Sequence, residues 1–169
     1  MPGQQTSCNE FLKRNLSERN DGLISMKEDC IFCKIADKEA DATVVYEDSY
    51  TLAFLDIHPL NPGHTLVIPK KHYPNMLEMP SEEAGRVFSS VHKIMKGVQK
   101  ASAADGISIG QSNGKAASQE VFHMHVHIIP RFSHEMMSGF PNRKQTHRAE
   151  LDEIGRKIKL AIAAKHPTF

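Results

Sequence analysis

Three histidines at alternate positions, His123, His125 and His127, form the most unusual pattern in the sequence. Side chains alternate between the two faces of a β-strand, so within a strand these imidazoles would share one face. A neutral imidazole at the centre of such a row can attack phosphorus, which divides one difficult displacement into two easier steps. Flanking imidazoles can fix its tautomer and stabilise charge on the phosphoryl oxygens. The apolar residues of the segment would face the core: Phe122, Met124, Val126 and Ile128.

Two other interpretations of the histidine row compete with this one. The first is a solvent-exposed strand that tolerates histidine. The second is a metal-binding row, since imidazole is the commonest metal ligand. Residues two apart on a flat strand lie about 6–7 Å apart, however, which is too wide for three tight ligands without strong bending. We therefore favour nucleophilic chemistry.

Three cysteines cannot all pair within one chain, and two of them, Cys30 and Cys33, form a C-x-x-C motif. In a reducing compartment this spacing indicates a metal-binding or redox pair and not a disulfide framework. A redox pair of the thioredoxin type needs a preceding strand and a βαβ context, and neither is predicted here. A zinc site needs two more ligands, for which His72 and His123 are available. Two buried thiols that pack as small hydrophobic residues are the third interpretation.

The surrounding sequence predicts the elements that must position these side chains. Short runs rich in Val, Thr, Tyr and Phe predict strands, and apolar residues at steps of three and four predict amphipathic helices. The predicted strands are 43–47, 51–56, 64–69, 106–111 and 121–131, and the predicted helices are 81–101 and 148–165. Consecutive strands with one long helix between them favour an antiparallel α+β domain.

The chain has 169 residues, which suits one domain with a real core. Residues 1–29 are polar and without pattern, so we expect a flexible extension followed by a domain over 30–133 and a C-terminal loop and helix over 134–169. Twenty-one Lys and Arg against 20 Asp and Glu argue against a dedicated nucleic-acid binder. No run of 18 apolar residues predicts a membrane span, and the N-terminus lacks the apolar stretch of a signal peptide. We expect a soluble cytoplasmic protein.

The segment His-Met-His-Val-His-Ile-Ile over 123–129 resembles the defining motif of the histidine triad (HIT) family of nucleotide hydrolases and transferases. Leu-Asp-Ile at 55–57, Gly-His-Thr-Leu-Val-Ile-Pro-Lys at 63–70 and His-Ile-Ile-Pro-Arg at 127–131 resemble other family segments, in the family's order. The resemblance covers about Cys30 to Arg131. It implies a HIT-like fold: a five-stranded antiparallel sheet with one long helix and a C-terminal helix. It also implies a homodimer with one continuous sheet, and a purine nucleotide bound with its α-phosphate beside the central histidine.

The resemblance also implies roles for individual residues. His125 would be the nucleophile, and His127 would contact the phosphate and help to protonate the leaving group. His64 resembles a family histidine that adjoins the triad. Asp56 would meet the ribose hydroxyls, and Ile57 with neighbouring apolar side chains would sandwich the base.

The loop before the triad would complete the substrate site through Asn113, Ser118, Gln119 and Glu120. It departs from the family pattern, which often has Gly where this chain has Ser118 and Ser or Thr where it has Glu120. A side chain at 118 can crowd the approach of phosphate to the main chain. A carboxylate at 120 donates no proton at neutral pH unless its pKa is raised.

The cysteine pair resembles the zinc-containing branch of the family. That branch has a C-x-x-C near the start of the domain, a histidine after the Pro-Lys segment and the first triad histidine. The implied ligands of a structural zinc ion are thus Cys30, Cys33, His72 and His123. His123 would then serve as a ligand and leave catalysis to the other two triad histidines.

The function that follows is hydrolysis or transfer at the α-phosphate of a purine nucleotide through a nucleotidyl-histidine intermediate. Nucleoside phosphoramidates and dinucleoside polyphosphates are the expected substrates. The alternative is a zinc-stabilised nucleotide-binding or interaction module with little turnover, which the unusual residues at 118 and 120 favour. The sequence does not select the leaving group, and it assigns no purpose to residues 1–29 or to the C-terminal segment.

Overall fold

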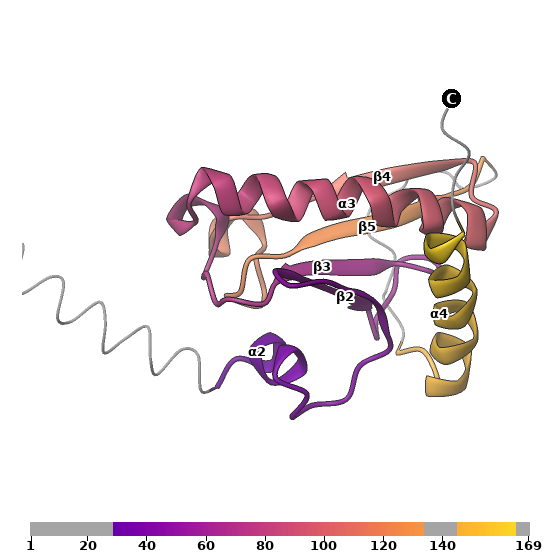
Figure 1. Cartoon of the computed structure of the whole chain (residues 1–169), viewed down its shortest axis with the longest axis horizontal. Coiled ribbons are helices and arrows are strands. Elements are labelled where there is room, and N and C mark those ends of the chain that lie inside the picture. Colours follow the sequence, from indigo (N-terminus) through magenta and orange to yellow (C-terminus); the bar gives the residue numbers. More distant parts are fainter. Residues whose placement is uncertain (1–28, 134–144, 165–169) are drawn as a thin grey trace, which may run out of the picture.

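One five-stranded sheet organises the protein, for which a computed structural model describes residues 29–133 and 145–164. The strand order is β1-β2-β3-β5-β4, and each neighbouring pair is antiparallel. Figure 1 shows the long helix α3 lying along the sheet. The strands are β1 (Val44–Glu47), β2 (Thr51–Leu55), β3 (Thr65–Pro69), β4 (Gly106–Gly110) and β5 (Val126–Arg131). The helices are α2 (Ile31–Ala36), α3 (Ser81–Ser102) and α4 (Arg148–Ala163), with short 3-10 turns at Met76–Glu78 and Lys115–Ala117. The predicted α+β sheet is therefore confirmed.

The two faces of the sheet are covered by different helices (Figure 1). Ala53 and Leu55 of β2 belong to a core cluster that includes the buried residues of α3 and α4. Leu52 and Phe54, which alternate with them, pack in a second cluster with the buried residues of α2. Because both faces are covered, every residue of β2 and β3 is buried. The face that α2 covers is the one that carries the functional residues described below.

The strand expected over 121–131 is five residues shorter, since β5 begins at Val126. Its ladder with β3 ends where Val126 pairs with Val67, although β3 continues to Pro69. Ahead of that point the chain leaves the ladder, and the imidazole of His123 reaches the carbonyl of Pro69 at 2.9 Å. Strand alternation therefore does not place the first two triad histidines. The expectation that Phe122 is a core residue is also wrong, because that side chain is 38% exposed.

Parts of the expected organisation lie outside the described residues. These are positions 1–28 of the expected N-terminal extension, most of the loop that opens the C-terminal segment, and the last five residues. Within the described parts, α3 begins at Ser81 as predicted and α4 spans Arg148–Ala163. No helix there is long and apolar enough to cross a lipid bilayer.

Candidate functional site

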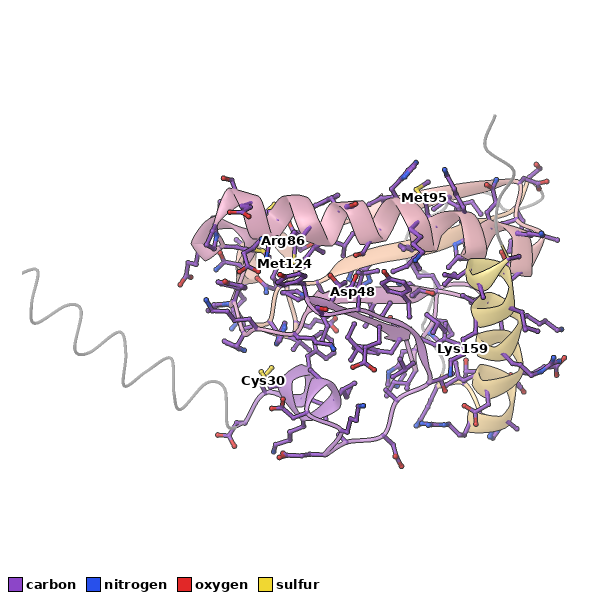
Figure 2. The ribbon with its side chains drawn as sticks, in the orientation of Figure 1. Cys30, Asp48, Arg86, Met95, Met124 and Lys159 are labelled. Atoms are coloured by element: carbon purple, nitrogen blue, oxygen red, sulfur yellow. The ribbon has the colours of Figure 1, made fainter. Side chains whose placement is uncertain are left out.

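His125 and His127 lie on the sheet face that α2 covers. His127, in β5, pairs with Leu66 of β3, and Leu66 packs in the α2 cluster. The ring of His125 meets the ring of Phe32 edge to face, with centroids 5.3 Å apart. The two imidazole centroids are 5.0 Å apart. Figure 2 shows the sulfur of Cys30 at the start of α2, on the side of the sheet away from α3. The triad and the cysteine motif thus meet on one face.

A main-chain carbonyl fixes the tautomer of His125. Its Nδ1 lies 2.6 Å from the carbonyl oxygen of His123, and since a carbonyl only accepts, this nitrogen carries the proton. In the neutral ring Nε2 then has the free lone pair. The side chain is only 7% exposed. The buried ring of His125 is therefore held with Nε2 unprotonated, which is the form of imidazole that can act as a nucleophile.

Burial lowers the pKa of His125 below its ordinary value of 6.5. The hydrogen bond to the His123 carbonyl and the carboxylates of Asp56 and Glu120 act in the opposite direction, without overcoming burial. The neutral, nucleophilic form of the ring is consequently the populated one at neutral pH.

A second hydrogen-bonded unit joins His127 to His64. The Nε2 of His64 lies 2.9 Å from the Nδ1 of His127, and the amide of Leu60 donates to the Nδ1 of His64 over 3.2 Å. A main-chain N–H only donates, so the Nδ1 of His64 accepts and its proton is on Nε2 when the ring is neutral. His64 then donates from Nε2 to the Nδ1 of His127, and a neutral His127 carries its own proton on Nε2. His64 is fully buried. The N–H of His127 is therefore on Nε2, in a ring whose centroid lies 5.0 Å from that of His125.

Asp56 places a negative charge behind this pair. One carboxylate oxygen lies 3.5 Å from the Nδ1 of His64, and the other accepts the amide of His58 at 2.9 Å. Asp56, His64 and His127 also have potential ligand atoms within 4.8 Å of one another. Hydrogen bonds already join the two histidines and the amide of Leu60, so we describe Asp56, His64 and His127 as a hydrogen-bonded group and not as a metal site. Ile57, next to Asp56, is 47% exposed, which leaves an apolar surface beside this group.

The side-chain amides of two of its own residues, Asn113 and Gln119, hold the loop over 112–120 in place. Gln119 is 4% exposed, accepts the amide of Gly114 at 2.7 Å and donates to the carbonyls of Pro74 and Val121. Asn113 accepts the amide of Met76 at 2.8 Å. Both side chains therefore hold the loop in place by bonds within the protein.

Ser118 and Glu120, the other two loop residues expected to meet substrate, are both exposed. Ser118 adopts a left-handed main chain with φ of 65°, a conformation that costs a residue with a side chain more than it costs glycine. The carboxylate of Glu120 favours the protonated form of His125 and so acts to raise the pKa of that ring, against the larger effect of burial.

The four expected metal ligands come together in one buried cluster. Ligand atoms of Cys30, Cys33, His72 and His123 all lie within 4.8 Å of one another. The Nδ1 of His72 is 3.2 Å from the sulfur of Cys33, and the Nδ1 of His123 is 3.4 Å from the sulfur of Cys30. Two thiols and two imidazoles are the donor set of closed tetrahedral zinc sites.

The hydrogen bond and the burial of His123 hold its ring in the form that binds a metal ion. Its Nε2 donates to the carbonyl of Pro69 at 2.9 Å, so its Nδ1 lone pair faces the two sulfurs. Burial lowers its pKa from 6.5 to about 4, with a smaller opposing effect of the Pro69 hydrogen bond. A neutral imidazole with an outward-held N–H is the form that coordinates a metal. The residues present thus fit a metal ion.

Two residues that contact the site, Phe32 and Leu60, were not predicted from the sequence. Phe32 carries no polar group, but its place inside the C-x-x-C motif was a signal that it would lie beside the cluster. Leu60 acts only through its amide, and no side-chain pattern marks a main-chain donor. All nine expected side chains of the triad, the cysteine cluster, His64 and the Asp56–Ile57 pair fall within the described residues.

Fold and site together define an α+β domain with a row of hydrogen-bonded histidines beside a thiol–imidazole cluster. The HIT domain model matches residues 37–134, and the chain belongs to the HIT family. It is 36% identical over 135 residues to the adenosine 5'-monophosphoramidase hnt1 of Schizosaccharomyces pombe, covering 77% of this chain and 98% of the relative. It is 37% identical over 134 residues to the adenylylsulfatase HINT3 of Arabidopsis thaliana, covering 79% and 68%.

Among solved structures, the chain resembles a zinc-bound histidine triad family protein from Mycobacterium smegmatis. The TM-score is 0.73 at 36% identity, covering 81% of this chain and 95% of the other. Together with the Cys/His cluster, this similarity fits the zinc-containing branch of the family.

Proposed function

We propose that this protein is a hydrolase or transferase acting at the α-phosphate of purine nucleotides through a covalent nucleotidyl-His125 intermediate. The observation that carries the proposal is the fixed tautomer of His125, whose Nδ1–H is held by the His123 carbonyl at 2.6 Å. A ring so held has one free lone pair and is neutral at working pH, as a nitrogen nucleophile must be.

In the first step the Nε2 lone pair of His125 forms a bond to the α-phosphorus as the bond from phosphorus to the leaving group breaks. The leaving group takes a proton from Nε2 of His127. The His64–His127 pair must therefore carry one proton more than its neutral form before this step. The carboxylate of Asp56, 3.5 Å from the Nδ1 of His64, stabilises that added charge. The ring of His125 becomes a phosphorylated imidazolium whose Nδ1–H remains on the carbonyl of His123.

In the second step a water molecule attacks the same phosphorus and the bond to Nε2 breaks. The water proton passes to His127, which restores the protonated pair, and His125 departs as the neutral imidazole. The products are the nucleoside monophosphate and the regenerated enzyme. One transferable proton on His64–His127 thus serves both steps.

For the nucleotide itself, Asp56 would accept the ribose hydroxyls and the exposed side chain of Ile57 would cover the base. The loop residues Asn113, Ser118, Gln119 and Glu120 would border the phosphate and the leaving group. The relatives named as a phosphoramidase and an adenylylsulfatase support adenylated substrates. Nucleoside phosphoramidates and dinucleoside polyphosphates are the candidates for this chain.

Zinc is the metal we propose for the Cys30, Cys33, His72 and His123 cluster. Bound there, it would supply a structural cross-link between the α2 turn and the sheet. Thiols that remain reduced to bind metal fit the cytoplasm. We also propose a homodimer that joins two sheets edge to edge: β4 pairs with β5 on one side, and its other edge has no strand beside it within the described residues.

The test is a substrate panel of an adenylated amine and a dinucleoside polyphosphate, with the released nucleotide measured and the protein mass determined after rapid acid-free quenching. We expect nucleoside monophosphate, and a mass increase of one nucleotidyl group that is absent in His125→Gln. A chain that binds nucleotide without turnover or adduct would instead be the interaction module. The exposed Ser118 and Glu120 in the substrate loop favour that second candidate.

A further inference from the structure

The metal cluster and the proposed nucleophile share a residue. His123 directs its side chain into the cluster, where Nδ1 lies 3.4 Å from the sulfur of Cys30 and 3.5 Å from that of Cys33. Its main-chain carbonyl accepts the Nδ1 proton of His125 at 2.6 Å. The main chain of His123 therefore connects the cluster directly to the hydrogen bond that sets the His125 tautomer.

A second contact connects the same two places. Phe32 lies between the two cysteines in sequence and is 7% exposed. Its ring meets the edge of His125 at a centroid distance of 5.3 Å and that of His123 at 6.0 Å. The helix that follows Cys30 is six residues long, and an isolated helix of that length is unstable in water. The position of Phe32 consequently depends on the packing and ligation of the cysteine turn.

We propose that the Cys30–Cys33–His72–His123 cluster is a positioning device for catalysis: ligation of a metal by these four residues fixes the His123 carbonyl and the Phe32 ring against His125. Loss of the metal then releases His125 from its reactive form. Metal occupancy would thus set the rate of the chemical step, beyond any effect on stability. This inference rests on the proposed function for its meaning, but its principal readout does not require turnover.

The first experiment follows the tautomer of His125 by ¹⁵N NMR in the full chain, with the signal assigned by its absence in His125→Gln. Zinc-loaded protein is compared with protein treated with a chelator and with chelated protein given zinc again. We expect the Nδ1–H form alone in the loaded protein, a mixture of forms after chelation, and recovery on refilling. Identical His125 signals in the loaded and metal-free proteins would overturn the proposal.

Chelation can unfold the chain, which far-UV circular dichroism would show. In that case His72→Asn replaces the chelated protein, since it keeps both cysteines and His123 and weakens metal binding, and its zinc-free form shows what the lost ring contact between His72 and His123 does by itself. Its His125 signal should follow the measured zinc content per chain as zinc is titrated in. A signal that stays constant across that titration also rejects the inference.

Phe54 is the matched control for Phe32. It is another buried ring of the apolar cluster between α2 and the sheet, and its centroid is 5.3 Å from that of Phe32. At full zinc content, Phe32→Leu should lower kcat by about tenfold or more with little change in KM, as the loss of a supporting contact around a metal site commonly does. Phe54→Leu removes a packing partner of Phe32 but keeps the Phe32 ring, so it should lower kcat clearly less than Phe32→Leu does. Equal effects of the two variants on kcat and on the His125 signal would contradict positioning by Phe32. If no substrate is turned over by any variant, the proposed function fails while the NMR result still decides the inference.

Discussion

His64 and His127 are 63 positions apart in sequence, yet the Nε2 of one lies 2.9 Å from the Nδ1 of the other. The Leu60 amide on the far nitrogen of His64 determines the direction of this hydrogen bond in the neutral pair. His64 is fully buried and His127 is half-buried, and in the proposed function the two rings act as one acid–base unit for His125. Removing the inner ring should affect proton transfer without touching the reacting phosphorus.

We expect His64→Leu to lower kcat by about 10²-fold for an adenylated amine, because that leaving group needs a proton and general acid catalysis contributes about 10²–10⁴-fold. The loss should be much smaller for an adenylate whose leaving group is a stable anion. Steady-state kinetics with both substrates measures the difference.

Thr65→Val is the matched control for His64→Leu. Thr65 is the next residue, is fully buried, and bonds only to the carbonyl of Gly63 through its hydroxyl in the contacts described. The control should retain the wild-type ratio of the two rates. A His64→Leu loss of equal size for both leaving groups would contradict the proton-transfer role.

The pH dependence of kcat/KM should show an acid limb below pH 6.5. The reaction requires neutral His125, and burial lowers the pKa of this ring below 6.5 in the folded state. As the pH falls, the ring therefore stays neutral through 6.5 and protonates only at lower pH, where activity is lost. A pH–rate profile of the free enzyme measures the limb, and one centred at or above 6.5 would refute the assignment. His92→Gln removes an exposed histidine of α3 and should leave the profile unchanged.

The sequence predicted the strands and the long helix because each depends on a local period, and the ligand cluster followed from the resemblance of its motifs to the zinc-containing branch. It failed at residues 121–125, where alternation predicted a strand. There a tertiary interaction prevails: His123 turns toward Pro69 and the two sulfurs, and the strand ladder therefore begins only at Val126. The Leu60 amide and the edge contact of Phe32 could not be predicted, since both depend on where the main chain passes in space.

Zinc removal should lower the thermal stability of the protein. Binding that favours only the folded chain contributes about 2.7 kcal/mol when free metal is 100 times its Kd, and about 2–4 °C in Tm accompanies each kcal/mol in a domain near this size. A chelator should therefore lower Tm by roughly 5–10 °C, and added zinc should restore it. Differential scanning calorimetry measures the shift. Cys33→Ser, which removes a buried ligand of the cluster, should lose most of the response to zinc. An unchanged Tm on chelation would be incompatible with a structural metal.

Gln119 gives the last prediction, since its side-chain amide joins the loop over 112–120 to Pro74 and to Val121. It accepts from Gly114 and donates to the carbonyls of Pro74 and Val121, all while nearly buried. Gln119→Leu leaves those main-chain groups without their partner, which costs about 1–3 kcal/mol for each buried group left unsatisfied.

We expect this variant to unfold at lower denaturant concentration and to raise KM more than it lowers kcat, because in the proposed function the loop borders the substrate and does not carry the reacting nitrogen. Gln111→Leu is the control: its side-chain amide bonds only to neighbouring Ser112 and Asn113 in the contacts described. It should be milder in both measurements. If Gln119→Leu keeps wild-type KM and stability, the amide neither holds the loop nor positions the substrate, and the loop must be ordered by Asn113 through the amide of Met76 instead.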